Sequence, residues 1–174
     1  RLDSLPIVTN GITHAIYIAR KLFCRKSIIL PKPRWENYDL IFEDKDIYEY
    51  DPLDPESLKQ VIDKSDVVLF NYPHNPTGYS LGKEDAEKIK GIVKGKTVIL
   101  DDAYEGLFFD NTYKHSLYHD LKENNLVVKA DGLTKEYFAW GLRMGFISVS
   151  ENCEELMDKA AAVVRQTVSS ISNI

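Results

Sequence analysis

The sequence predicts an α/β fold of three layers, in which a mainly parallel sheet is covered by helices on both faces. Apolar runs of strand length alternate along the chain with segments whose apolar residues recur at helical spacing. Such alternation favours parallel strands that are joined by right-handed crossovers. Polar groups also stand directly after several of the apolar runs, which is typical of ligand sites at the carboxyl ends of parallel strands.

The individual elements follow from periodicity and turn signals. The first helix is expected directly after the Asn10-Gly11 turn, and segment 38–42 fits a strand or a helix equally well. Helices are expected at 12–23, 55–64, 86–93, 117–123 and 156–167. Strands are expected at 27–30, 47–50, 67–70, 97–100, 126–128 and 145–149.

Length and composition indicate a soluble globular protein with one domain. The chain has 174 residues, of which 44% are hydrophobic and 28% charged, so it can bury one core. Its net charge of -5 argues against a nucleic-acid partner, which would need clustered Lys and Arg. No apolar stretch approaches the ~20 residues that a membrane span requires, and no signal-peptide pattern opens the chain.

The cysteines and histidines argue against metal sites and disulfides. Cys24 and Cys153 stand far apart, and the four histidines form no Cys/His array. We therefore expect no metal, and a reducing cytoplasm as the location. Because the chain begins with Arg1 rather than Met, we also expect that an amino-terminal part precedes it.

Four motifs carry polar groups that a single site could use. They are Asn75-Pro76-Thr77-Gly78, Asp101-Asp102-Ala103-Tyr104, Lys135 within Gly-Leu-Thr-Lys-Glu, and Arg143 eight residues later. Taken singly, each has an ordinary structural explanation: a turn, a helix cap beside a half-buried tyrosine, a surface lysine and an ion pair. The first three motifs follow expected strands, so a parallel sheet would bring them together.

In this order and spacing, the motifs closely resemble those of the class I/II aminotransferases, which are fold type I enzymes dependent on pyridoxal 5'-phosphate. The resemblance covers about residues 8–150 and includes Arg143 within Trp140-Gly141-Leu142-Arg143-Met144-Gly145. It implies the large domain of an enzyme similar to aspartate aminotransferase, with one antiparallel strand near 145–149. It also implies a homodimer that acts on an amino acid and a 2-oxo acid.

The resemblance assigns roles around the cofactor ring. Lys135 would form the internal aldimine and then act as the general base at the substrate Cα. Asp101 would keep the pyridine nitrogen protonated, which makes the ring an electron sink. Asn75 and Tyr104 would hydrogen-bond the 3'-oxygen of the ring. Trp35 would stack on the ring face, with simple core packing as the alternative.

The same resemblance locates the cofactor phosphate at the start of the first helix. Segment Asn10-Gly11-Ile12-Thr13-His14-Ala15 is similar to the family's glycine-containing phosphate loop, and the free amides and dipole of a helix start suit a dianion. Arg143 would add a bidentate cationic partner. The residues implied at the phosphate end are Gly11, Ile12, Thr13, Thr134 and Arg143.

Two features depart from the family pattern. Gly132 stands where many relatives carry a serine that contacts the phosphate, so we expect one contact fewer. Family members are also much longer, with an amino-terminal arm, a small domain and a carboxylate-binding arginine near the carboxyl end, whereas no arginine follows Arg165 here. We therefore expect residues 1–174 to be the cofactor-binding large domain without the arm and small domain, and to be inactive alone.

Two other functions use the same residues. A lysine, an aspartate and a tyrosine so arranged also serve decarboxylases and lyases of this fold, since the site rather than the fold decides the reaction. Aminotransferase-like domains are also effector sensors in transcription regulators, where they follow a DNA-binding module. The sequence upstream of Arg1 would distinguish such a regulator from an enzyme.

Overall fold

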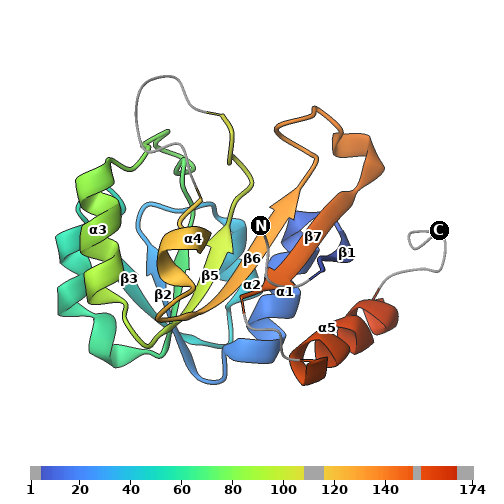
Figure 1. Cartoon of the computed structure of the whole chain (residues 1–174), viewed down its shortest axis with the longest axis horizontal. Helices are drawn as coiled ribbons and strands as arrows, with labels where there is room; N and C mark the ends of the chain where they lie inside the picture. Colours follow the sequence, from blue (N-terminus) through green and yellow to red (C-terminus); the bar gives the residue numbers. More distant parts are fainter. Residues whose placement is uncertain (1–4, 108–115, 151–153, 168–174) are drawn as a thin grey trace.

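The computed structural model describes residues 5–107, 116–150 and 154–167. These residues form a seven-stranded sheet (Figure 1). The strands are β1 (Ile7–Asn10), β2 (Ser27–Pro31), β3 (Asp46–Tyr50), β4 (Val67–Phe70), β5 (Thr97–Asp101), β6 (Leu126–Gly132) and β7 (Met144–Val149). Their order across the sheet is β1-β7-β6-β5-β4-β2-β3. Strand β7 is antiparallel to both of its neighbours, and the other neighbouring pairs are parallel.

Helices cover both faces of this sheet (Figure 1). The α-helices of the described residues are α1 (Ile12–Phe23), α2 (Asn37–Ile41), α3 (Lys83–Ile92), α4 (Tyr118–Leu121) and α5 (Glu154–Thr167), and the 3₁₀ helices are η1 (Pro55–Gln60), η2 (Ile62–Lys64) and η3 (Trp140–Leu142). Helices α1, α2 and α5 pack on one face, where Ile16 and Val164 join its core. Helices η1, η2, α3 and α4 pack on the other, where Leu58 and Ile89 are buried.

The pairing of the strands brings their ends to one edge of the sheet. Asp101, the last residue of β5, lies opposite Ala130 of β6, so the carboxyl ends of these parallel strands are neighbours. Strand β7 runs the other way, and its first residue, Met144, pairs with Asn10 at the end of β1. The start of α1, the segment before β7 and the turns after β4, β5 and β6 therefore share this edge.

The fold class predicted from the sequence is confirmed, including an antiparallel strand where β7 lies. Segment 38–42 falls mainly in helix α2. Segment 55–64 is helical as expected, but it forms two 3₁₀ helices, because Pro55 and the capping carboxylate of Asp54 favour a short, tight turn here. Strand β1 was not expected, since its four residues are ordered by pairing with a strand far along the chain.

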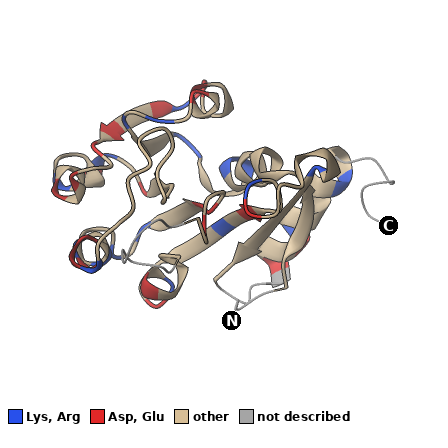
Figure 2. Cartoon of the chain, turned by 90° about the horizontal axis from the view of Figure 1, so that it is seen from above, with Lys and Arg blue, Asp and Glu red and all other residues tan. Residues whose placement is uncertain are grey.

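The described part of the chain contains no helix that is both long and apolar enough to cross a membrane. Among the same residues, no three His, Cys, Asp or Glu side chains are grouped so that they could hold a metal ion. Figure 2 shows Lys and Arg interspersed with Asp and Glu along the helices.

Candidate active site

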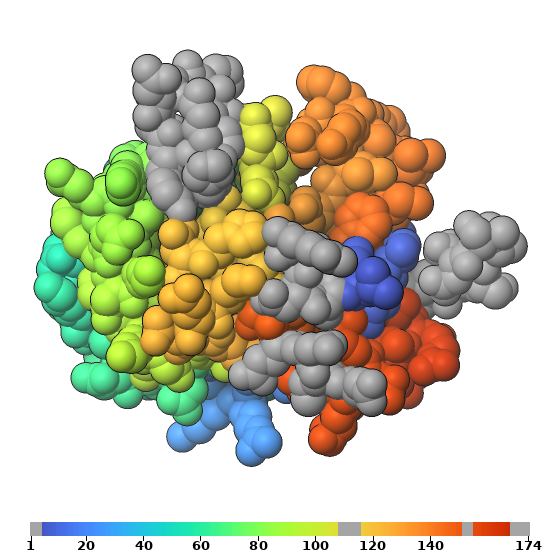
Figure 3. Space-filling model, viewed as in Figure 1, coloured from blue at the N-terminus to red at the C-terminus, as the bar shows by residue number. Residues whose placement is uncertain are grey.

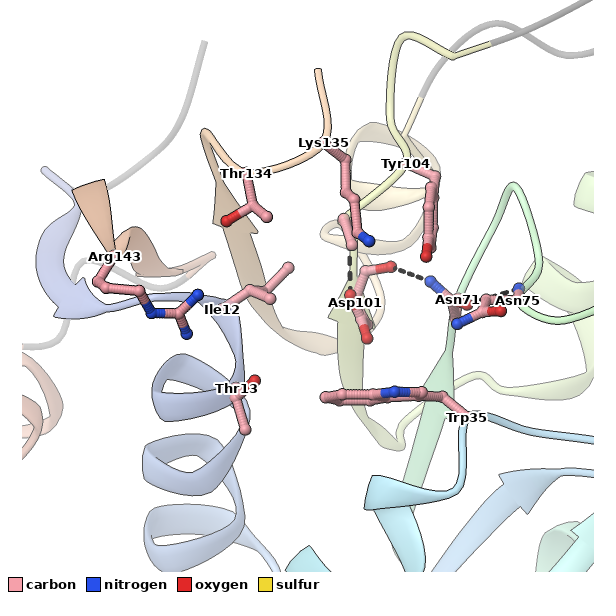
Figure 4. A pocket seen from close by; sticks show the side chains of 11 residues that line it. Ile12, Thr13, Trp35, Asn71, Asn75, Asp101, Tyr104, Thr134, Lys135 and Arg143 are labelled. Atoms are coloured by element: carbon pink, nitrogen blue, oxygen red, sulfur yellow. Dashed lines mark hydrogen bonds between the residues drawn. The ribbon is translucent and has the colours of Figure 1, made fainter. Parts of the chain in front are cut away.

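A pocket of about 300 Å³ opens at the carboxyl edge of the sheet (Figure 4). In the space-filling view, a notch at the top of the molecule separates the segment around residue 105 from the segment around residue 138 (Figure 3). Most of the side chains expected from the sequence to form a site border this pocket. Its lining residues are Ile12, Thr13, Trp35, Asn71, Asn75, Asp101, Ala103, Tyr104, Thr134, Lys135 and Arg143.

The ends of the elements account for this gathering. Asp101 closes β5 and Asn71 directly follows β4, so both stand at the carboxyl ends of central strands. Lys135 comes three residues after β6, in the turn that leads to η3. Arg143 directly precedes β7, and because β7 is antiparallel, this residue also lies at the same edge. Ile12 begins α1, which starts there as well.

Asp101 is a buried carboxyl with neutral hydrogen-bond donors. Its side chain accepts hydrogen bonds from the Tyr38 hydroxyl and from the amide of Ala103, the latter at 3.2 Å. Burial raises the pKa of Asp101 to about 6; these two hydrogen bonds oppose that rise, and the nearby charge of Asp131 adds to it. A cationic partner for this carboxylate would therefore be strongly stabilised at this point.

Tyr38 was not identified as a site residue from the sequence. Its ring is fully buried and meets Trp35 edge to face, with the two ring centroids 5.5 Å apart. Its hydroxyl donates to Asp101, so one side chain supports both the aromatic floor of the pocket and the buried carboxylate. Trp35 stands two residues before α2 and Tyr38 lies within it, so no local pattern in the sequence indicated this contact with Asp101.

Asn71 is a second residue that sequence reasoning missed. Its side-chain amide donates to the backbone carbonyl of Asp101 at 2.8 Å, and its Oδ1 accepts from the backbone amide of Asn75 at 2.9 Å. Asn71 thus joins the turn after β4 to the end of β5 (Figure 4). Its place immediately after a buried strand is the signal in the sequence that could have indicated it.

Lys135 and Tyr104 face one another across the pocket mouth. The ammonium nitrogen of Lys135 lies 5.6 Å from the centroid of the Tyr104 ring. In Figure 4 the lysine side chain points down between Thr134 and Tyr104, above the flat ring of Trp35. Lys135 itself is exposed, while Trp35 and Tyr104 are half-buried. An amine in this position can reach a molecule that rests on the Trp35 ring.

The start of α1 forms a cradle suited to an anion. Gly11 is the N-cap residue, has a φ of 79° and offers no side-chain cap, so the first helical amides are available to a ligand. A Cβ on Gly11 would lie 2.8 Å from Nη2 of Arg143, which shows how closely the guanidinium approaches this backbone. Thr13 and Thr134 line the pocket beside it.

Two further glycines let the cradle pack tightly. A Cβ on Gly145 would come within 2.7 Å of the Gly11 carbonyl oxygen, so only glycine allows β7 to touch the start of α1 in this way. A Cβ on Gly132 would lie 3.2 Å from the Met144 carbonyl oxygen. Gly132 is buried and does not line the pocket, whereas Thr134 does.

We compared the sequence and the structure with those of known proteins. The sequence matches the family model for aminotransferase class I and II over residues 3–173. The chain belongs to this family. Class I and II aminotransferases depend on pyridoxal 5'-phosphate, a cofactor that the solved structure of cystalysin from Treponema denticola contains. The solved structure resembles this chain with a TM-score of 0.79 at 19% identity, covering 93% of this chain and 45% of that one.

Individual class I and II aminotransferases are distant in sequence but close in fold. Aspartate aminotransferase from Pyrococcus horikoshii is 26% identical, over 97% of this chain and 46% of its own length. The solved aromatic aminotransferase from the same organism has a TM-score of 0.81 at 22% identity, covering 93% of this chain and 46% of that one. This chain thus spans about half the length of the relatives it matches.

Proposed function

We propose that this chain is the cofactor-binding large domain of a pyridoxal-phosphate-dependent aminotransferase, which exchanges an amino group between an amino acid and a 2-oxo acid. One observation carries the proposal. The Lys135 amine, the buried Asp101 carboxyl and the cradle at the start of α1 all border the same pocket. Its size is within the range of small-molecule sites.

The residues of the pocket fit the cofactor at both of its ends. Among the residues that the structure describes, the donors to the buried Asp101 side chain are the uncharged Tyr38 hydroxyl and Ala103 amide, and a protonated pyridine nitrogen would supply a cation. At the opposite side of the pocket, Arg143 and the amides that follow Gly11 would hold the phosphate. Figure 4 agrees with this assignment, because Arg143 and Asp101 lie apart with Ile12 between them, and Asp101 lies below the Lys135 side chain.

When bound, the cofactor supplies a ring that withdraws electrons from the substrate Cα. The chain's own residues would do the rest of the work. Lys135 would anchor the cofactor and carry a proton to and from the substrate Cα, a task that its flexible side chain at the pocket mouth suits. Asn75 and Tyr104 would donate hydrogen bonds to the oxygen on the ring. Trp35 would cover one ring face and exclude water from it.

We further propose that the active protein is a homodimer in the cytoplasm and contains segments beyond this chain. Tyr137, Phe138, Trp140 and Leu142 are 64–86% exposed on the segment after Lys135 (Figure 3). A patch of large apolar side chains next to a pocket is typical of a surface that another chain or domain covers. Buried, free Cys24 is compatible with a reducing compartment.

The test is a half-reaction with the complete polypeptide that contains this chain. Purified protein with pyridoxal phosphate should show a visible absorption band, which an added amino acid removes as the matching 2-oxo acid appears. The same mixture containing only residues 1–174 should bind the cofactor without turning over at that rate. If an amino acid instead loses carbon dioxide or its side-chain sulfur, the protein is a decarboxylase or a lyase of this family.

A further inference from the structure

Lys129, on β6, lies opposite Leu100 of β5 and contacts three carboxylates. Its side chain is only 11% exposed. Its ammonium nitrogen lies 3.4 Å from Asp102 Oδ2 and 3.3 Å from Asp131 Oδ2, and it donates a hydrogen bond to Glu105 Oε2. Burial alone would lower the pKa of Lys129, but the three carboxylates outweigh burial and raise that pKa, so the ammonium stays charged.

The three carboxylates lie on two segments that border the pocket, namely the turn after β5 and strand β6 with the turn that follows it. Asp102 and Glu105 flank Tyr104 in the turn after β5, which we name the Tyr104 loop (residues 102–107). Asp131 is on β6, and its Oδ1 accepts a hydrogen bond from the Gly132 amide at 2.7 Å, just before Lys135. Lys129 thus ties the Tyr104 loop to the strand that leads to Lys135.

The Tyr104 loop has few backbone hydrogen bonds of its own. The bonds found within it are two turn bonds, from the Glu105 amide to Asp102 at 3.1 Å and from the Leu107 amide to Tyr104 at 3.0 Å. The Asp102 amide also donates to the Ala130 carbonyl of β6 at 2.9 Å, which holds the start of the loop on the sheet. Side chains must therefore hold the part of the loop beyond Asp102. A Cβ on Gly106 would lie 3.0 Å from Glu136 Oε1, so the loop also touches the residue that follows Lys135.

We propose that Lys129 is a positioning residue, which fixes the Tyr104 loop on β6 so that the Tyr104 ring and the Lys135 amine face each other across the pocket. The structural part of this inference stands on the contacts of Lys129 alone. Its consequence for cofactor binding rests on the function proposed above. No atom of Lys129 borders the pocket, so it acts through Glu105 and Asp102 rather than on a ligand.

The size of the effect follows from the burial of the cluster. Removing the ammonium would leave Asp102, which is 5% exposed, and two neighbouring carboxylates without their shared cation. Breaking a buried ion pair by deleting one partner is costly, because the remaining carboxyl must stay charged without a partner or take up a proton. Burial already raises the pKa of Asp102 to about 7, although Lys129 opposes that rise. Asp102 keeps a hydrogen bond from Ser116 Oγ at 2.6 Å, whereas Glu105 would lose the partner that holds its side chain inward.

The experiment compares Lys129→Met with Lys96→Met in the cofactor-free protein by amide hydrogen exchange. Lys96 is a matched control, since its side chain is 18% exposed, donates to the Ser65 carbonyl at 3.0 Å and lies at the opposite edge of the sheet. In Lys129→Met, the amides of Glu105 and Leu107 should exchange about tenfold faster or more relative to those of β5, because the loop opens locally. In Lys96→Met this ratio should stay at the wild-type value.

Equal acceleration in both variants, or in the loop and β5 alike, would show an ordinary structural ion pair and overturn the proposal. Glu105→Gln covers the case in which Lys129→Met does not fold, because it removes one carboxylate and leaves the lysine paired with Asp102 and Asp131. It should accelerate exchange in the same loop by a smaller factor. A wild-type exchange rate in this variant would count equally against the proposal.

Cofactor binding then separates this inference from the proposed function. If wild type shows the visible band, the midpoint pH at which that band titrates should differ from wild type in Lys129→Met. It should equal the wild-type value in Lys96→Met and be close to it in Lys129→Arg, which restores a cation. An unchanged titration in Lys129→Met would refute positioning by Lys129. A wild-type protein without any band would refute the proposed function, while the exchange measurement would still decide the role of Lys129.

Discussion

The two sides of the pocket are built in different ways. On one side, Asp101 and Asn71 are buried at the ends of central strands, and the Asn71 side-chain amide donates a hydrogen bond to the Asp101 backbone carbonyl. On the other, Lys135 and Arg143 are exposed on segment 133–143, which leaves the sheet after β6 and returns to it at β7. Arg143 even adopts a left-handed conformation, with a φ of 48°, which an arginine rarely takes.

This difference indicates which part of the site the domain can organise alone. The buried side is held by β4, β5 and the Tyr38 hydroxyl, so its polar groups are fixed before any ligand arrives. The exposed side carries a non-glycine residue with positive φ and a row of uncovered apolar side chains, which are features that contacts with another chain or domain would stabilise.

The largest expected effect is on the exposed side. Lys135→Ala should lower turnover of the complete polypeptide by about 10³-fold or more, since both the covalent anchor and the proton carrier are lost. Borohydride reduction of the wild-type complex should fix the cofactor on the peptide that contains Lys135, as mass spectrometry would show. Lys159→Ala, a control on the surface of α5, should keep both properties. Cofactor fixed on a different peptide would contradict the assignment.

On the buried side, the expected effect depends on pH. The pKa of Asp101 is about 6 in the folded chain against an ordinary value of 3.8. Between about pH 4 and about pH 6, Asp101 is therefore more protonated in the folded than in the unfolded state. The free energy of unfolding should fall as pH rises through this range, by ~1 kcal/mol per pH unit. Asp101→Asn should flatten that fall, as urea unfolding at a series of pH values would measure.

Two comparisons make this measurement specific to Asp101. Burial lowers the pKa values of His14 and His74, so these side chains also contribute to the pH dependence of stability. They contribute in wild type and in Asp101→Asn alike, so the difference in slope between the two proteins isolates Asp101. Asp66→Asn, which changes a fully exposed carboxylate, should leave the slope unchanged. Pyridoxal phosphate should also reduce the fall, because a cationic ring would keep Asp101 ionised. If Asp101→Asn leaves the slope of stability against pH unchanged, the pKa of Asp101 is not raised in the folded protein.

Sequence patterns predicted the sheet and the side chains at its carboxyl edge because both depend on local signals. The strand at 67–70 is apolar at every position, Asp101 follows such a run directly, and Lys135 lies in the turn after another. A periodicity of this kind needs no knowledge of the partner strand. The antiparallel direction of β7, in contrast, came from the resemblance rather than from a local pattern, and it was then found in the pairing with β6.

What the sequence did not reveal was contact between distant segments. Tyr38 reaches Asp101, and Lys129 gathers Asp102 and Glu105, through packing that no local pattern encodes. Strand β1 was missed for the same reason, since a strand of four residues is stabilised by its neighbour rather than by its own propensity. Supporting side chains of a site are therefore harder to predict than the groups that face the ligand.

A third prediction returns to the exposed side and concerns affinity. Arg143→Ala should weaken cofactor binding by ~2 kcal/mol, as expected when a charged hydrogen-bond donor to an anion is lost. Asp101→Asn should instead leave the cofactor bound and lower turnover, because a neutral amide cannot hold a proton on the ring. Fluorescence titration and steady-state kinetics would separate the two effects. Arg165→Ala, an exposed arginine on α5, serves as the control, and the reverse pattern would mean that the cofactor is oriented the other way.

The smallest expected change in folding stability comes from the apolar side chains on segment 133–143. Replacing both Trp140 and Leu142 by serine should alter the free energy of unfolding by no more than ~0.5 kcal/mol, because both side chains already face solvent. The same change should abolish or weaken self-association, which analytical ultracentrifugation over a range of concentrations would detect. Leu40→Ser is the matched control, since Leu40 is 69% exposed and Leu142 is 67% exposed. Leu40 lies on α2, away from this segment, so its loss should leave association intact. If Leu40→Ser disrupts association as strongly, or the double variant leaves it unchanged, the exposed side of the pocket is not the surface that a second copy covers.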